Sequence, residues 1–105
     1  MPISDTDNVI DRDTRNKLKP KKPELFQVVL INDDYTPFEF VILVLNRYFN
    51  KSPDEAISIT MHTHKHGKGV CGVYTLEICE AKVNDAIKLA KENEFPLNLE
   101  VQRLT

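Results

Sequence analysis

Long apolar runs, paired cysteines and a charged N-terminal leader are all missing from this sequence. No apolar run approaches the roughly 18 residues that a membrane helix needs, and the opening MPISDTDNVI is acidic. We therefore expect neither a membrane span nor export, and place the protein in the cytoplasm. Two cysteines, Cys71 and Cys79, are too few for a disulfide scaffold. Both sit among apolar neighbours, which predicts reduced, buried thiols.

Features of common enzymes and of nucleic-acid binders are also scarce. The segment HGKG at 66–69 is too short for a phosphate-binding loop, and no serine or threonine follows its lysine. A cysteine could pair with a histidine, but nothing in the sequence supplies a low thiol pKa or an oxyanion hole. The formal net charge is −2, and basic residues do not interleave with aromatic ones on one predicted face. Catalysis and nucleic-acid binding are thus poorly supported.

The composition changes near residue 24. Residues 1–24 hold few large apolar side chains and include the basic run RNKLKPKKP, which predicts a flexible N-terminal arm. Residues 25–105 have the mixed apolar and charged texture of one small globular domain.

The first half of this domain reads as a strand followed by two helices. LFQVVLI at 25–31 is rich in β-branched and aromatic residues, as in a strand buried on both faces. Two helix starts then share one design, with a hydroxyl at N-cap, proline at N1 and glutamate at N3, in TPFE at 36–39 and SPDE at 52–55. We expect the first helix to run to about Asn50 and the second to stop before Gly67. The side chains predicted to be buried are Val41, Val44, Leu45 and Tyr48, then Ala56, Ile59 and Thr63.

The second half reads as strand, helix, strand. GKGVCGVYT at 67–75 predicts a strand, and a helix follows over about Glu77–Glu92, ended by a left-handed Asn93. PLNLEVQRL at 96–104 alternates apolar and polar residues, as a half-exposed strand does. The order β-α-α-β-α-β predicts an α+β fold in which three strands form one sheet with the helices packed on one face.

An acidic turn, Asn32-Asp33-Asp34, separates the first strand from the first helix. Asparagine and aspartate are common in turns, because their side chains bond nearby backbone. The same residues also gather acceptor oxygens at a helix N-terminus, which suits a cation with several donors such as an ammonium group. The residues alone leave both interpretations open, with the ordinary turn the more common.

Three histidines alternate at 62, 64 and 66. On a strand, His62, His64 and His66 would share one face and could bind zinc or copper. On a helix, steps of two residues scatter them. We expect them at the end of the second helix, and keep a small metal-binding protein as the alternative function.

Three segments carry a resemblance to a known family. VVLINDDYTPFEFVILVLNRYF, HKHGKGVCGVYTLEICEAKV and ENEFPL are similar to the signature segments of the ClpS family, in the same order and spacing. The resemblance implies a non-enzymatic adaptor without a cofactor, acting as a monomer. Such adaptors bind proteins with N-terminal Leu, Phe, Tyr or Trp and deliver them to the N-terminal domain of the ClpA unfoldase, which feeds the ClpP protease. They also modulate ClpA's choice of substrate. The implied fold is a three-stranded antiparallel sheet against three helices, similar to the C-terminal domain of the ribosomal stalk protein.

The resemblance also implies roles for individual residues. The substrate's α-ammonium would be held by Asn32, Asp33 and His64, which gives the acidic turn a function. Docking on the unfoldase would fall to Glu77 and Lys82. The pocket for the first side chain would be formed by Asp34, Thr36, Phe38, Val41, Thr60, Thr63 and Leu97. Methionine is common in the family at positions 38 and 60, so Phe38 and Thr60 leave open the preference among the four first residues.

Overall fold

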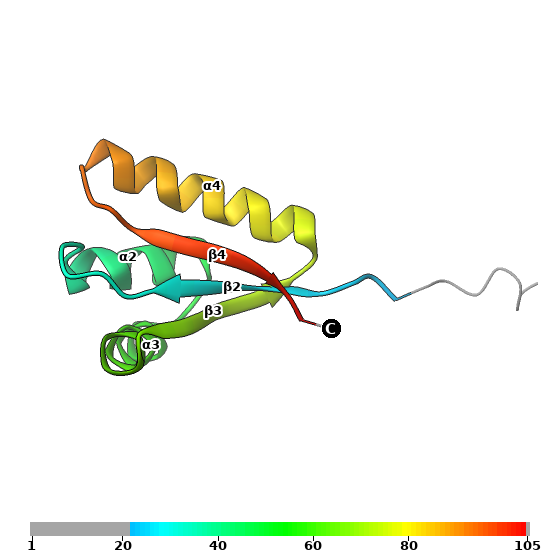
Figure 1. Cartoon of the computed structure of the whole chain (residues 1–105), viewed down its shortest axis with the longest axis horizontal. Coiled ribbons are helices and arrows are strands. Elements are labelled where there is room, and N and C mark those ends of the chain that lie inside the picture. The colour runs from blue at the N-terminus through cyan, green and yellow to red at the C-terminus, as the bar shows by residue number, and fades with distance from the viewer. Residues whose placement is uncertain (1–21, 105) are drawn as a thin grey trace, which may run out of the picture.

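The computed structural model describes residues 22–104, which form a three-stranded sheet and three helices (Figure 1). The strands are β2 (Phe26–Ile31), β3 (Lys68–Tyr74) and β4 (Asn98–Arg103), and the helices are α2 (Phe38–Tyr48), α3 (Pro53–His66) and α4 (Leu76–Glu92). The predicted order and α+β class are confirmed. The predicted arm lies almost wholly outside the described residues. No helix among residues 22–104 is long and apolar enough to cross a membrane.

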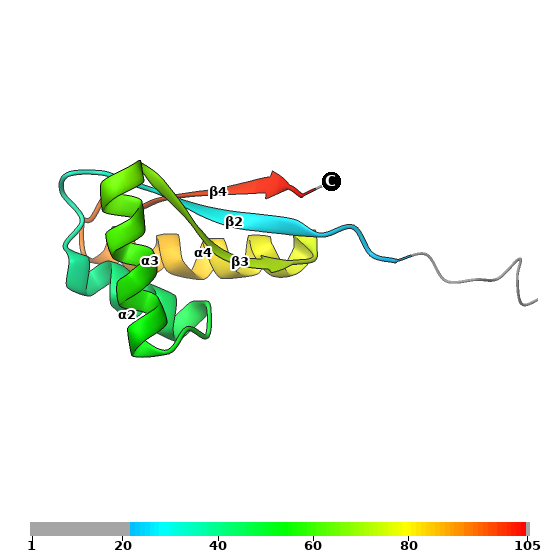
Figure 2. The same ribbon diagram turned by 90° about the horizontal axis from the view of Figure 1, so that it is seen from below.

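The central strand of the sheet is β2. Its neighbours β3 and β4 both run antiparallel to it, in the order β3-β2-β4. Figure 2 shows α2 and α4 on one side of the sheet, with α3 crossing beside β3. Because β2 is paired on both sides and its middle residues Val28, Val29 and Leu30 are all buried, it is the apolar strand that the sequence predicts.

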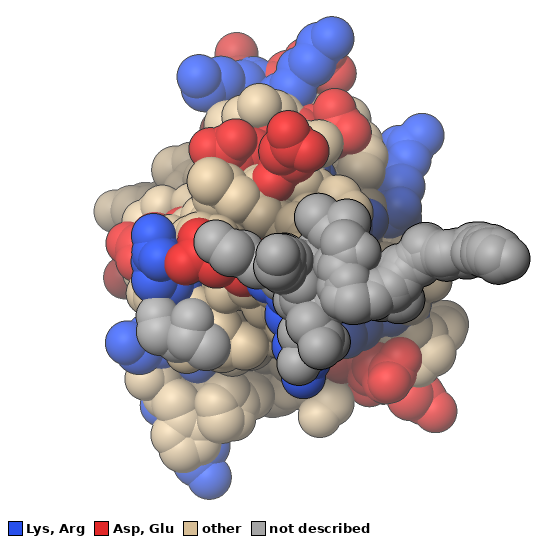
Figure 3. Space-filling view, turned by 90° about the vertical axis from the view of Figure 1, so that its right-hand side faces the viewer, with Lys and Arg blue, Asp and Glu red and all other residues tan. Residues whose placement is uncertain are grey.

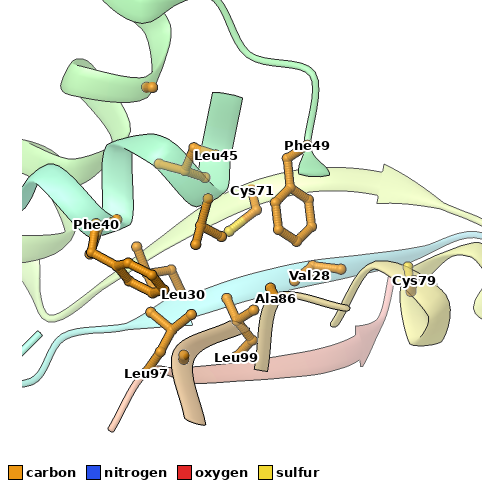
Figure 4. Packing of buried hydrophobic residues seen from close by; sticks show 14 residues of the cluster. Val28, Leu30, Phe40, Leu45, Phe49, Cys71, Cys79, Ala86, Leu97 and Leu99 are labelled. Carbon is orange, nitrogen blue, oxygen red and sulfur yellow. The ribbon is translucent and has the colours of Figure 1, made fainter. Parts of the chain in front are cut away.

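The core lies between the sheet and the helices (Figure 4). Val28 and Leu30 point from β2 toward Leu45 of α2, and Cys71 of β3 lies close by. Ala86 of α4 and the other small helical residues let that helix approach the sheet closely. Of the side chains expected to be buried, Tyr48 and Ile59 are only half-buried, and on α3 Thr60 lies in the interior instead of Ile59.

The two predicted capping boxes have different outcomes. At α3 the box is present: Glu55 N donates to Ser52 Oγ at 3.2 Å, and Ser52 N donates to Glu55 Oε1 at 3.0 Å. At α2 the prediction of a Thr36 cap is wrong. Pro37 is the N-cap residue there, with no side-chain cap bond, and the Thr36 hydroxyl points to the Asp33 carboxylate, to which it donates at 2.9 Å.

The end of α4 also differs from expectation. Asn93 has φ −100°, and the left-handed residue is Glu94 at φ 62°. Phe95 N donates to Ala90 O at 2.9 Å and Glu94 N donates to Lys91 O at 3.1 Å, which is the bond pattern of a Schellman motif. The ring of Phe95 then packs on Phe40, with centroids 4.9 Å apart. Burying Phe95 favours the one-residue shift over the intrinsic preference of asparagine.

Candidate binding site

A narrow pocket opens at the carboxyl end of β2, between that strand and the facing sides of α2 and α3. Its free volume is about 20 Å³. That is room for about one or two water molecules, so the pocket is narrow in this structure. The lining residues are Leu30, Ile31, Asn32, Asp33, Thr36, Phe38, Val41, Thr60, Thr63 and Leu97. Most predicted pocket residues are therefore gathered in one place, and Leu30 and Ile31 are additions that the sequence analysis missed.

Asp33 organises the loop at the polar end of this pocket. Its Oδ1 accepts the backbone N–H groups of Tyr35 at 2.8 Å and Thr36 at 2.7 Å, and its Oδ2 accepts the Thr36 hydroxyl at 2.9 Å. A carboxylate has about four acceptor sites, so three donors leave one free on Oδ2. The carboxylate is thus fixed in place while keeping one acceptor site for a ligand.

Asn32 is held next to the end of α3 by its backbone. Its N–H donates to Gly67 O at 2.9 Å. Gly67 caps α3 in the left-handed conformation at φ 95°, and its own N–H donates to Thr63 O at 2.8 Å. This pair of bonds joins the loop after β2 to the last turn of α3. Among the described residues the side-chain amide of Asn32 has no hydrogen-bond partner, so its oxygen is an available acceptor.

The two threonines in the pocket wall donate their hydroxyl hydrogen bonds to backbone carbonyl groups within α3. Thr60 Oγ1 donates to Ala56 O at 2.7 Å, and Thr63 Oγ1 donates to Ile59 O at 2.8 Å. Both side chains are buried. Because both hydroxyl donors are already bonded, a ligand side chain in contact with them does not need to supply a hydrogen-bond acceptor. Together with Val41 and Leu97 it forms an apolar lining.

Two of the predicted site residues stand at the edge rather than in the lining. Asp34 is exposed in the loop. His64 is exposed in the last turn of α3, and its ring meets that of Phe38 edge-on at 5.0 Å between centroids. Since Phe38 lines the pocket, His64 borders the site on the side that Phe38 forms.

The three histidines do not converge. All lie on α3, where His62 and His66 stack at 4.4 Å between centroids and His64 faces Phe38 instead. Among residues 22–104 no three His, Cys, Asp or Glu side chains are placed to share a metal ion. The alternative of a metal centre built from all three histidines is contradicted by this helical geometry.

Glu77 and Lys82, the two residues expected on a docking face, differ in their surroundings. Glu77 is exposed in the first turn of α4, and acidic side chains gather over the start of that helix in Figure 3. Lys82 is half-buried: its Nζ donates to Tyr48 O at 2.7 Å and lies 5.0 Å from the centroid of the Tyr74 ring. The ammonium thus caps the carboxyl end of α2, where cations are favoured.

A narrow apolar pocket that ends in free carboxylate and amide acceptors is typical of a small α+β binding domain. Similarity to known proteins shows which family of such domains this chain belongs to. The family model described as ATP-dependent Clp protease adaptor protein ClpS matches residues 21–100. A ClpS adapter of Parvibaculum lavamentivorans is 50% identical over 90 residues, covering 86% of this chain and 82% of that protein. One of Hyphomonas neptunium is 46% identical over 93 residues, covering 89% and 79%. The chain belongs to the ClpS family of Clp protease adaptors.

The fold agrees with a solved structure of the same family. Agrobacterium tumefaciens ClpS2 bound to L-phenylalaninamide matches with a TM-score of 0.75 and 40% sequence identity, covering 78% of this chain and 99% of that one. The two strongest expectations from the sequence, the family and the fold, are thereby confirmed.

Proposed function

We propose that this protein binds other proteins by an N-terminal Leu, Phe, Tyr or Trp and delivers them to the ClpA unfoldase of a Clp protease in the cytoplasm. One observation supports the proposal most directly: a single narrow cavity contains both an apolar lining and the free acceptors of Asn32 and Asp33. A first residue presents the matching pair of features, an apolar side chain and an α-ammonium, on a single carbon atom.

The α-ammonium suits the polar end of the pocket. An α-amino group has a pKa of about 7.7–8.0, so it is mostly charged at neutral pH and offers three donors. We assign these donors to the Oδ2 of Asp33, the side-chain oxygen of Asn32 and a ring nitrogen of His64. An internal residue offers only an uncharged amide N–H, so position at the N-terminus is read through charge and donor number.

The remaining parts of the first residue suit the rest of the cavity. Its side chain would enter between Val41, Leu97 and the satisfied threonines, with Phe38 at the mouth. The ligand of the Agrobacterium relative, L-phenylalaninamide, has the same chemistry: a free α-amine, an aromatic side chain and an amide in place of a terminal carboxylate.

For delivery we assign the docking contacts to the start of α4. Glu77 is available there as an exposed charge, whereas Lys82 would contribute while holding the end of α2. Delivery and peptide binding are separable, because the two faces are different parts of the fold.

Titration of a fluorescent Leu-initiated peptide, beside its N-acetylated twin, tests the binding half of the proposal. We expect the free peptide to bind and the acetylated one to fail. Asp33→Asn is the sharper variant, since an asparagine carbonyl can still accept the N–H groups of Tyr35 and Thr36 while the charge is lost. It should weaken binding by about 2 kcal/mol, roughly 30-fold. Equal binding of the acetylated and free peptides would refute the assignment.

A further inference from the structure

Two exposed apolar side chains lie on α3, the helix that also carries the pocket residues Thr60 and Thr63. Ile57 is 46% exposed and Met61 50% exposed. With His64 they are spaced i, i+4, i+7 on α3 and so form one stripe along that helix. Phe38, 41% exposed at the mouth, packs against the ring of His64 at 5.0 Å. We call Phe38, Ile57 and Met61 the ridge.

The ridge is close enough to meet the residue that follows a bound N-terminus. Helix neighbours three or four positions apart have Cβ atoms about 5–6 Å apart, which places Met61 beside His64. Consecutive Cα atoms of a peptide are 3.80 Å apart. If His64 contacts the ammonium of residue one, the side chain of residue two emerges within reach of Met61. The acidic loop on the other side of the pocket carries one exposed aromatic side chain, Tyr35, directly after Asp34.

We propose that the ridge is a subsite for the second residue of the substrate and that it favours a large apolar side chain there. The proposal rests on the function proposed above and deepens it: the adaptor reads two positions, the first through charge and a closed pocket, the second through an open apolar surface. The ridge residues are solvated in the free protein, so covering them removes apolar surface from water. Half-burying one aliphatic side chain corresponds to a preference of about 5-fold over glycine.

Four peptides and three variants test the subsite. The peptides begin Leu-Leu, Leu-Ile, Leu-Gly and N-acetyl-Leu-Leu, with one common sequence afterwards, and binding is measured by fluorescence anisotropy on the full chain. The variants are Met61→Ser, the double variant Ile57→Ser/Met61→Ser, and Leu43→Ser as the matched control. Leu43 is 44% exposed, but it lies five residues beyond Phe38 on α2, about 140° around the helix.

We expect the wild type and Leu43→Ser to bind Leu-Leu and Leu-Ile about 5-fold more tightly than Leu-Gly. The preference should shrink in Met61→Ser and shrink further in the double variant, where Phe38 is the remaining ridge residue, while the affinity for Leu-Gly stays unchanged. Equal affinity of the wild type for Leu-Gly and Leu-Leu, with the acetylated peptide still rejected, overturns the subsite and leaves the proposed function standing. A preference that is undiminished in the double variant also overturns it. Failure of every free-amine peptide to bind overturns both proposals.

Discussion

Gly69 of β3 lies directly against α3, and replacing it with alanine should disturb both stability and the pocket. A Cβ at this position would lie 2.3 Å from Thr63 Oγ1, 3.5 Å from Ile59 O and 3.6 Å from the His62 ring. The first contact is far too short, and the atom belongs to a stiff β-branched side chain that donates to Ile59 O at 2.8 Å. Relief requires Thr63 to rotate and lose that bond, or α3 to move away from the strand.

Either adjustment has a calculable cost. Overpacking in a well-packed interior costs about 1–3 kcal/mol, and a lost hydrogen bond costs about 1 kcal/mol. We therefore expect Gly69→Ala to lower the free energy of unfolding by about 2–3 kcal/mol. Because Thr63 lines the pocket, affinity for a Leu-initiated peptide should fall as well. Urea denaturation measures the first quantity, and peptide titration the second.

A double-mutant cycle isolates the clash. Thr63→Ala removes the atoms that a Cβ at position 69 would strike, so the double variant should be more stable than the sum of the single losses by about 1–2 kcal/mol. Gly67→Ala is the control: nothing lies within 4 Å of its added Cβ, but its φ of +95° is left-handed. It should cost about 1–2 kcal/mol through backbone strain alone, with no relief from Thr63→Ala. A Gly69→Ala protein as stable as the wild type, or one that Thr63→Ala does not rescue, would contradict the packing argument.

Three further predictions concern other parts of the molecule. Lys82→Met should lower the free energy of unfolding by about 1 kcal/mol, the value of a charge-assisted bond reduced for partial exposure. Urea denaturation measures this, with Glu77→Gln as a control that should be neutral. A Lys82→Met protein as stable as the wild type would refute the helix cap. Phe38→Ala should improve the affinity for an Ile-initiated peptide relative to a Leu-initiated one, since the ring narrows the mouth where a β-branch would lie; equal rejection of Ile by both proteins would show that the ring is not the gate. Burial raises the pKa of Cys71 to about 12, and the pKa of Cys79 is also raised, mainly by burial. Because both side chains are fully buried, a thiol reagent at pH 8 should label either cysteine only on unfolding; rapid labelling of the native protein would refute this.

The sequence was sufficient for the order of elements because each one carries its own local signal. Alternation or an apolar run marks every strand, and Ser52-Pro53 with Glu55 specifies the start of α3 by contacts within four residues. Local signals failed where a neighbouring group competes for the same atoms or where a distant contact decides the conformation. Thr36 appears in sequence as a helix cap, but the carboxylate of Asp33 takes its hydroxyl. Asn93 gives up the left-handed position to Glu94 so that Phe95 can reach Phe40.

The same limit applies to the candidate site. The acidic turn and the pocket walls on α2 and α3 could be assigned from motifs, whereas Leu30 and Ile31 join the lining only because the strand ends beside both helices. Lys82 shows another side of this limit. The resemblance assigns it to a docking face, and its contact with Tyr48, which spans 34 positions of sequence, follows only from how α4 packs against α2.

The position of the acidic loop at the end of the central strand has a mechanical consequence. A protein being pulled into an unfoldase would exert tension on whatever holds its N-terminus. Tension applied at Asn32 and Asp33 passes directly into β2, whose six residues pair with β3 on one side and β4 on the other. A pull along the strand loads both antiparallel ladders together in shear, so many backbone hydrogen bonds share the force. The few bonds to an α-ammonium should break well before the sheet does. The adaptor would then release the bound protein while staying folded, and could bind another one.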